Sequence, residues 1–320
     1  MPTLGADRDP RARLNNLRGH KHMSDSIKPN FLIIGAMKAS TTLLYNMLGR
    51  HPQIWFPAEK EPHYFTSPDY GKPNAYQAYL DLFAQCPPGK KFIGEASTGY
   101  SKAPYMGFTP QRIRATLGHP KMIYILRDPV QRTVSNYQHA FANGWYRAGY
   151  PLCQAAIDDP IIIGASLYAR QLSEYEAEFG IGSLHVVIAD ELHREPARVL
   201  GEVERYLGAD PFDGWNRPVE RVNSISAVRE AVVLKRLLGK SALVRNVGRH
   251  VPTWIKSAVL NMAPKPPQAL AITQQDEDKV FSLVVDDLKN PHLRFGDRID
   301  CWPSVRRLCG EANLARPAAH

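Results

Sequence analysis

The sequence has few cysteines and no long apolar run. Its four cysteines (Cys86, Cys153, Cys301 and Cys309) are spread over 320 residues, and none forms a CxxC pair. Chains this poor in cysteine are rarely built on disulfides, so we expect free thiols in a reducing compartment, with a local Cys301–Cys309 bridge as the open alternative. No window approaches the roughly 18 apolar residues of a membrane span. These absences predict a soluble, cytoplasmic protein.

The first 28 residues also lack an apolar stretch of signal-peptide length. They are polar, and basic side chains are densest between residues 8 and 21. We expect residues 1–28 to form a disordered tail and the folded part to begin at Pro29. Hydrophobic residues make up 44% of the chain, which is enough to bury a core.

Acidic residues are fewer than basic ones, 31 against 40, which gives a formal net charge of +9. Such a balance suits an anionic ligand, a nucleic acid or an acidic membrane surface. The sequence has no helix-turn-helix, RNP-like or zinc-finger pattern, so we expect no nucleic-acid partner. It also lacks HExxH and other metal-ligand spacings, and we expect no metal.

Short apolar runs alternate with segments of helical spacing, which is typical of an α/β fold around a parallel sheet. We therefore predict a P-loop-like three-layer fold, with a central, mostly parallel sheet flanked by helices. From about residue 210 the pattern becomes helical, and we expect an extension packed on a single domain of residues 29–320. The expected strands are residues 31–35, 91–95, 121–126 and 184–189, and the expected helices are 41–50, 130–141, 166–179, 195–207, 228–238 and 274–288.

The segment GAMKASTT, residues 35–42, joins the first strand to the first helix. Backbone N–H groups at a helix N-terminus bind anions, a lysine adds a compact charge, and threonines add hydroxyl donors. The segment is not a Walker A loop, because Met37 stands where that motif has glycine before the lysine. We predict a phosphate loop around Lys38; the alternative is an ordinary strand–helix turn with a surface lysine.

A second anion-binding motif follows the strand at 121–126. Arg127, Asp128 and Pro129 come directly after this strand, and Ser135 lies eight residues beyond Arg127 in the next predicted helix. Ligands of α/β sheets bind at the carboxyl ends of strands. A guanidinium and a hydroxyl placed there can hold one phosphate. The alternative for Arg127 is a salt bridge with Asp128 or another acid.

Four segments together resemble one family, the PAPS-dependent sulfotransferases, which use 3′-phosphoadenylyl sulfate (PAPS). GAMKASTT resembles their 5′-phosphosulfate loop, and YILRDPVQRTVSNY, residues 124–137, resembles their 3′-phosphate motif. PAEKEPHYF, residues 57–65, and GEASTGY, residues 94–100, are similar to segments of the heparan-sulfate and bacterial carbohydrate sulfotransferases. The blocks occur in the family's order between residues 30 and 140. The resemblance implies transfer of a sulfuryl group to a hydroxyl, with release of PAP.

The resemblance also implies roles for individual residues. Lys38 would contact the bridging oxygen and sulfate of PAPS and stabilise the leaving phosphate. Glu61 would be the general base, with His63 beside it. The other cofactor-binding residues implied are Ala39, Ser40, Thr41 and Thr42 for the 5′-phosphate, Arg127 and Ser135 for the 3′-phosphate, and Arg229 in a late loop that closes on it.

Two positions depart from the family pattern. Ser40 stands where the loop often has glycine, so its side chain must point away or donate to phosphate. Ala96 replaces the lysine of the GEKSPSY segment, which puts a polyanionic, heparan-type acceptor in doubt. Because the chain shows no Golgi membrane anchor, we expect an enzyme of the bacterial type.

Several alternatives stay open at this stage. Glu61 could be an ion-pair partner of Lys60 and not a base. A nucleotide kinase is a rival, because HVVIADE, residues 185–191, resembles a Walker B strand, although Asp190 and Glu191 are better interpreted as helix-start or structural acids. A catalytically inactive PAP or anion-binding protein is another. The acceptor is expected to carry a hydroxyl on a carbohydrate, a glycolipid or a secondary metabolite. Aromatic residues that could stack on it, or belong to the core, are Trp55, Phe56, Tyr64, Phe65, Trp145, Tyr146 and Tyr150.

Overall fold

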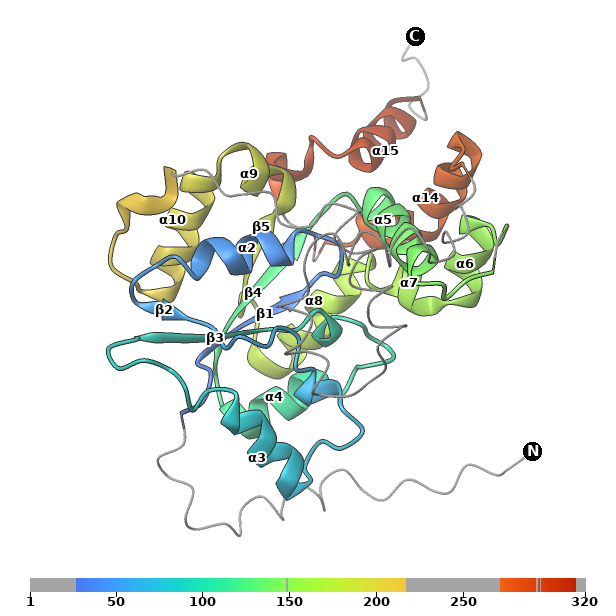
Figure 1. Cartoon of the computed structure of the whole chain (residues 1–320). Helices are drawn as coiled ribbons and strands as arrows, with labels where there is room; N and C mark the ends of the chain where they lie inside the picture. Colours follow the sequence, from blue (N-terminus) through green and yellow to red (C-terminus); the bar gives the residue numbers. More distant parts are fainter. Residues whose placement is uncertain (1–26, 148, 217–270, 292, 294, 315–320) are drawn as a thin grey trace, which may run out of the picture.

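Five strands form one parallel sheet in the order β2-β3-β1-β4-β5 (Figure 1). The computed structural model describes residues 27–147, 149–216, 271–291, 293 and 295–314. Each strand of the sheet pairs with its neighbours in parallel, so the predicted α/β class is confirmed. The strands are β1 (Phe31–Gly35), β2 (Ile54–Trp55), β3 (Phe92–Ala96), β4 (Lys121–Leu126) and β5 (Leu184–Ile188).

Helices cover both faces of the sheet, as the three-layer prediction requires. In Figure 1, α2 and α10 lie on one side of the sheet, and α3 and α4 lie on the other. Short 3₁₀ turns at 64–66, 98–100, 213–216 and 296–299 complete the described part. The helices are α2 (Thr41–Leu48), α3 (Pro73–Asp81), α4 (Thr109–Leu117), α5 (Pro129–Ala142), α6 (Leu152–Asp158), α7 (Pro160–Gly164), α8 (Tyr168–Phe179), α9 (Ala189–Arg194), α10 (Pro196–Leu207), α14 (Gln274–Leu288) and α15 (Pro303–Leu314).

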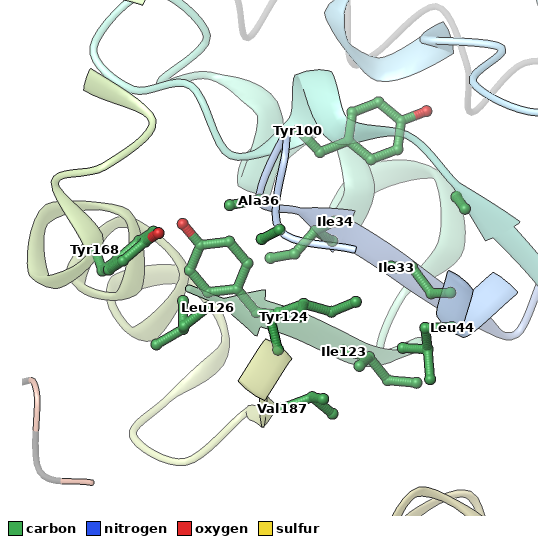
Figure 2. Close-up of a cluster of buried hydrophobic side chains, with 14 of the residues drawn as sticks. Ile33, Ile34, Ala36, Leu44, Tyr100, Ile123, Tyr124, Leu126, Tyr168 and Val187 are labelled. Atoms are coloured by element: carbon green, nitrogen blue, oxygen red, sulfur yellow. The ribbon is translucent and has the colours of Figure 1, made fainter. Parts of the chain in front are cut away.

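The core lies on the central strands. β1 is buried along its whole length, and β4 is buried except at its first residue. Strands covered by helices on both faces need apolar residues at every position, which explains the unbroken runs FLIIG and MIYIL. Figure 2 shows Ile33, Ile123 and Val187 from three strands beside Leu44 of α2. This packing fixes the loops at the ends of the strands.

The sheet brings three carboxyl-terminal loops together. β1 lies between β3 and β4, so the chain leaves β1, returns on one side of it as β3, and then crosses to the other side as β4. Parallel α/β sheets bind ligands at such a crossing point. Gly35, the last residue of β1, has φ +144, and a Cβ on it would lie 2.0 Å from Ser101 Oγ. Only glycine fits where the segment after β3 meets the loop after β1.

The described C-terminal residues are fastened to the helices that follow β4. In α14, the Asp287 carboxylate accepts the N–H groups of Ala169 and Arg170 at 2.9 and 3.1 Å. At the start of α15, the N–H and Oγ of Ser304 donate to Asp128 Oδ2 at 2.9 and 2.6 Å. The other oxygen of Asp128 caps α5 by accepting from the N–H of Gln131 at 2.9 Å. One buried carboxylate therefore joins α15 to α5.

Replacing Asp128 by alanine is expected to lower the free energy of unfolding by about 2–3 kcal/mol. The variant loses a helix cap and leaves the two buried donors of Ser304 without an acceptor. Urea unfolding measures the change. The control is Asp69→Ala, which breaks the exposed ion pair with Lys72 and should cost less than about 1 kcal/mol. Equal losses in the two variants would contradict the role of Asp128.

Two further sequence predictions concern absent features. No helix in the described ranges is long and apolar enough to span a membrane. All four cysteines are free, so the Cys301–Cys309 bridge does not form in this structure.

Candidate active site

The phosphate loop, residues 35–42, has the geometry of an anion-binding site. Lys38 and Ser40 both have left-handed backbones, with φ 69 and 70, on either side of Ala39. The N–H groups of Lys38, Ser40 and Thr41 donate to no backbone or side-chain acceptor in the described part of the chain. Alternating backbone conformations turn successive N–H groups toward one point, and the α2 N-terminus adds its dipole. The loop can therefore surround an oxyanion.

Lys38 adds a positive charge to this loop. Its ammonium group has no hydrogen bond or ion pair among the described residues, and the side chain is half-buried. Burial lowers the pKa of Lys38, and the nearby charges of Arg127 and Arg132 lower it further, against an opposing effect of Glu61. A partly dehydrated cation with cationic neighbours gains strongly from a bound anion. The ordinary turn with a surface lysine does not describe this loop.

Arg127 connects β4 to the phosphate loop. Tyr168 donates from its hydroxyl to the Arg127 carbonyl at 2.7 Å, and the Arg127 guanidinium donates to the Lys38 carbonyl at 3.3 Å. Asp128 is occupied by α5 and Ser304, so the alternative of an Arg127–Asp128 salt bridge is wrong. Ser135 lies on α5, half-buried, with no hydrogen bond to Arg127. Arg127 thus lies at the carboxyl end of β4, and Ser135 lies about two turns into the helix that follows it.

Arg132 is a residue of the site that the motif analysis missed. Its side chain is fully buried, and it donates to Ser166 Oγ at 2.5 Å, to the Ile162 carbonyl and to the Met37 carbonyl at 3.3 Å. Burial lowers the pKa of Arg132 to about 10. Arginine is almost never fully buried without a partner charge. An arginine on the apolar face of α5 is therefore unusual, and this was the feature of the sequence that could have identified Arg132 as a site residue. The guanidinium therefore stabilises the phosphate loop through the Met37 carbonyl.

Glu61 carries an ionised carboxylate with three neighbours. Lys60 Nζ lies 2.7 Å from Oε1, His63 Nε2 lies 3.3 Å from Oε2, and Thr98 Oγ1 donates to Oε2 at 3.2 Å. Burial by itself would raise the pKa of Glu61, but the hydrogen bond from His63 and the charge and hydrogen bond of Lys60 lower it to about 2. The alternative ion pair with Lys60 is therefore present, and the role of Glu61 as general base stays a prediction.

The segment around Glu61 is fastened to the end of β3. The Glu61 N–H donates to the Ala96 carbonyl at 3.0 Å, and the His63 N–H donates to Ser97 Oγ at 3.2 Å. A Cβ at Gly99 would lie 2.7 Å from His63 Nδ1, so glycine is needed for the imidazole to approach. Both Glu61 and His63 have positive φ, 63 and 55, a conformation that costs a non-glycine residue about 1–3 kcal/mol and that is often found at functional sites.

The buried carboxylate of Glu95 stabilises the segment after β3 to which the Glu61 turn is attached. Glu95 accepts from Ser97 Oγ at 2.6 Å and from the Tyr79 hydroxyl at 2.7 Å. Burial raises the pKa of Glu95, partly offset by these two hydrogen bonds. Ser97 also accepts from the His63 N–H. Glu95, Ser97 and His63 therefore form one hydrogen-bonded network, which holds the turn that carries Glu61 in place.

Two more titratable side chains border the site, and the sequence analysis assigned neither. Burial lowers the pKa of His139 on α5, and the charge of Lys38 lowers it further. Burial also lowers the pKa of Lys102, which follows the 3₁₀ turn after β3. Glu61 raises the pKa of both groups. The charge of Glu61 therefore raises the pKa of Lys38, Lys102 and His139, which come from three other segments of the chain.

The remaining predicted site residues have separate outcomes. The Ser40 hydroxyl is hydrogen-bonded to His193 Nε2 at 2.8 Å, so the side chain points toward α9 and away from the loop. Thr41 is buried, and Thr42 is half-buried in the first turn of α2. Arg229 lies outside the described residues.

The acids of the Walker B-like run have structural partners. Asp190 accepts from Trp302 Nε1 at 3.0 Å, and Glu191 forms an ion pair with Arg298 at 2.7 Å. They begin α9, which confirms their interpretation as helix-start and structural acids. Within the described residues, no group of three or more His, Cys, Asp or Glu side chains could hold a metal ion.

The aromatic residues divide between core and surface. Phe56, Tyr64 and Phe65 are buried in the core, so stacking on an acceptor is excluded for them. Trp145 is 62% exposed, and its ring centroid lies 6.0 Å from that of His139, edge to face. Trp145 is therefore an exposed ring next to a site residue.

The fold is an α/β fold with a loop suited to oxyanions at the carboxyl edge of its sheet, and sequence comparison shows which family it resembles. The sequence model described as "Sulfotransferase family" matches residues 69–214. Over these residues, a little under half of its length, the chain is similar to the sulfotransferase family. The match includes Arg127 and Ser135 and begins after the phosphate loop.

Curated relatives carry sulfotransferase names. The chain is 28% identical over 207 residues to the bifunctional heparan sulfate N-deacetylase/N-sulfotransferase 2 of Homo sapiens, covering 59% of this chain and 23% of the relative. It is 26% identical over 244 residues to the heparan sulfate glucosamine 3-O-sulfotransferase 5 of Mus musculus, covering 71% of this chain and 68% of the relative. The chain thus spans about a quarter of the length of the first relative.

A solved structure has the same arrangement over most of its length. The sulfotransferase from Alicyclobacillus acidocaldarius superposes with a TM-score of 0.52 at 26% identity, covering 68% of this chain and 99% of that one. The similarity supports the P-loop-like sulfotransferase fold.

Proposed function

We propose that the protein transfers the sulfuryl group of PAPS to a hydroxyl of a carbohydrate acceptor and releases PAP. One observation carries the proposal. The phosphate loop presents Lys38 and N–H groups that have no acceptor among the described residues, it contacts a second cation, Arg127, and the charge of Glu61 acts on Lys38. PAPS has two phosphate positions and a transferable sulfuryl group, which matches two anion sites and a base. The match of residues 69–214 to the sulfotransferase family model supports the same activity.

The side chains would share the reaction as follows. The acceptor oxygen forms a bond to sulfur while the bond between sulfur and the bridging phosphate oxygen breaks. Lys38 stabilises the charge that develops on the leaving phosphate, and the loop N–H groups hold it in line. Because the pKa of Glu61 is about 2, the carboxylate accepts the hydroxyl proton only after S–O bond formation has made that proton acidic.

The carbohydrate acceptor rests on two observations. The curated relatives are named for heparan sulfate, and the exposed Trp145 ring lies next to His139. Aromatic rings offer an apolar face to ligands that are polar elsewhere, as sugars are. A glycolipid headgroup presents the same chemistry.

The experiment is transfer of radiolabelled sulfate from PAPS to a panel of sugars and to a cell extract, with mass spectrometry of the product. We expect label in a sulfate ester and an unchanged rate in EDTA. PAP binding without transfer to any acceptor would instead indicate an inactive binding protein. Phosphate transfer from ATP that depends on Mg²⁺ would indicate a kinase.

Replacing Arg127 by methionine is expected to weaken PAP binding about 10- to 100-fold, because charge-assisted hydrogen bonds contribute about 1.5–3 kcal/mol. Ser135→Ala should weaken it by less, about fivefold, since it removes one neutral hydroxyl. Calorimetry with AMP, which lacks the 3′-phosphate, is the control and should give the parent affinity in both variants. An equal loss for AMP would place Arg127 on the 5′-phosphate.

A further inference from the structure

The side chain of Ser40 is bonded to a helix that is distant in the sequence. The Ser40 hydroxyl and His193 Nε2 lie 2.8 Å apart, although 153 positions separate the two residues. His193 belongs to the last turn of α9, which begins directly where β5 ends. Because β5, β4 and β1 are parallel, α9 begins at the same edge of the sheet as the phosphate loop. The hydrogen bond therefore joins this loop to α9.

The helix α9 is held in place by other contacts. In its first turn, Asp190 accepts from Trp302 Nε1 at 3.0 Å, and Glu191 forms an ion pair with Arg298 at 2.7 Å. Glu191 and Trp302 are buried, whereas His193 is exposed. A substitution of His193 should therefore leave the position of the helix unchanged.

Ser40 has a backbone conformation that is unfavourable for serine. Its φ of 70 and ψ of 24 lie in the left-handed region, which only glycine adopts without a penalty from Cβ. A serine that precedes a helix more often has an extended backbone, and its oxygen accepts the N–H of the second or third helical residue. Ser40 makes no such bond. Of these two arrangements, the left-handed one leaves the first N–H groups of α2 to an anion.

The hydroxyl is the group of Ser40 that another element can hold. Its carbonyl is used within the helix, where it accepts the Leu44 N–H at 3.2 Å. Lys38, the other left-handed residue of the loop, is held differently, since its carbonyl accepts from the Arg127 guanidinium at 3.3 Å. Each of the two left-handed residues thus has a hydrogen bond from outside the loop, and for Ser40 the partner is His193.

We propose that His193 is a positioning residue for cofactor binding. By holding the Ser40 hydroxyl, it keeps Ser40 left-handed and prevents the hydroxyl from capping α2 in the place of the 5′-phosphate. The inference rests on the proposed function for the identity of the ligand. Glycine at position 40 would need no such support, so Ser40 and His193 act as a pair.

A double-mutant cycle tests the inference, with PAP affinity measured by calorimetry. We expect His193→Ala to weaken PAP binding about fivefold, which corresponds to about 1 kcal/mol. His193→Gln, whose amide can also bond to a hydroxyl, should keep the affinity within twofold of the parent. In a Ser40→Gly background, His193→Ala should change the affinity by less than twofold, because glycine has no hydroxyl to hold and is left-handed without support.

A second histidine supplies the matched control. His119 is exposed, is hydrogen-bonded to Arg114 at 3.0 Å, and precedes β4, at the opposite edge of the sheet from the phosphate loop. His119→Ala should keep the parent affinity for PAP.

Four outcomes contradict the inference. The first is a parent affinity in His193→Ala. The second is an equal loss in the parent and Ser40→Gly backgrounds, since His193 would then act without Ser40. The third is a loss that glutamine does not restore, which would indicate a role of the imidazole charge. A parent protein without affinity for PAP would overturn both the inference and the proposed function. A protein that binds PAP and transfers no sulfate to any acceptor counts against the proposed function alone.

Discussion

Replacing Lys38 by methionine is expected to lower the rate of sulfuryl transfer about 100- to 1,000-fold, the usual cost of removing one group that stabilises transition-state charge. Methionine keeps the length and apolar stem of the side chain and removes only the charge. The loop N–H groups should stay in place. The loop is shaped by its left-handed residues and by hydrogen bonds from Arg127 and Arg132 to its carbonyls, and none of these involves the Lys38 side chain. Steady-state rates with saturating PAPS measure the effect.

The effect of Lys38→Met on kcat should be compared with its effect on the affinity for PAP, the product. PAP affinity should fall less than about tenfold, because PAP retains its contacts with the loop and Arg127. Lys90→Met, which removes a lysine that donates to the carbonyls of Pro52 and Ile54, should leave the rate unchanged. If PAP affinity and kcat fell by the same large factor, Lys38 would be a binding residue with no special role in the transition state.

Glu61→Gln is expected to lower kcat about 100- to 10,000-fold, the range for loss of a positioned general base. The pH dependence is the sharper part of this prediction. The pKa of Glu61 lies at about 2, below its ordinary value, so the group stays ionised from pH 5 to pH 8. The ratio of parent to variant rates should therefore be constant across that range. It should decline only as the pH falls toward 2, where the parent loses its carboxylate.

The neighbouring Glu59 supplies the matched control. Its side chain is exposed, and Glu59→Gln should keep the parent rate at every pH. A parent-to-variant ratio for Glu61 that decreases between pH 6 and pH 5 would mean that the Lys60 and His63 contacts do not hold the carboxylate as described. A variant with the parent rate would show that another group removes the proton.

The central part of the fold was predictable because its strands are buried on both faces. FLIIG and MIYIL are runs of buried residues without a charged side chain, and the predicted strands at 31–35 and 121–126 match β1 and β4 residue for residue. β2 was not predicted, since two residues carry no periodicity, and neither was α9, whose six residues begin directly where β5 ends. The expected helix at 228–238 lies outside the described residues.

The site was predictable where a motif is contiguous. Residues 35–42 and the Arg127 segment stand out as loops after strands, and the structure brings them into contact. Arg132, Lys102 and His139 were missed because each acts through neighbours on other elements. Arg132, for example, reaches a carbonyl of the phosphate loop 95 residues away in sequence. The low pKa of Glu61 also depends on the left-handed turn that folds His63 back onto it, which composition does not encode.

The bond between Ser304 and Asp128 has a practical consequence for anyone who shortens this protein. The family match ends at residue 214, and a chain truncated there would omit α14 and α15. Asp128 would then keep its cap on α5 and lose the partner on its other oxygen, while the Asp287 contacts that anchor the start of α8 would also disappear. Truncation after residue 214 would therefore loosen Arg127 and Ser135 from a distance, and the shortened chain would be a weak nucleotide binder with an intact phosphate loop.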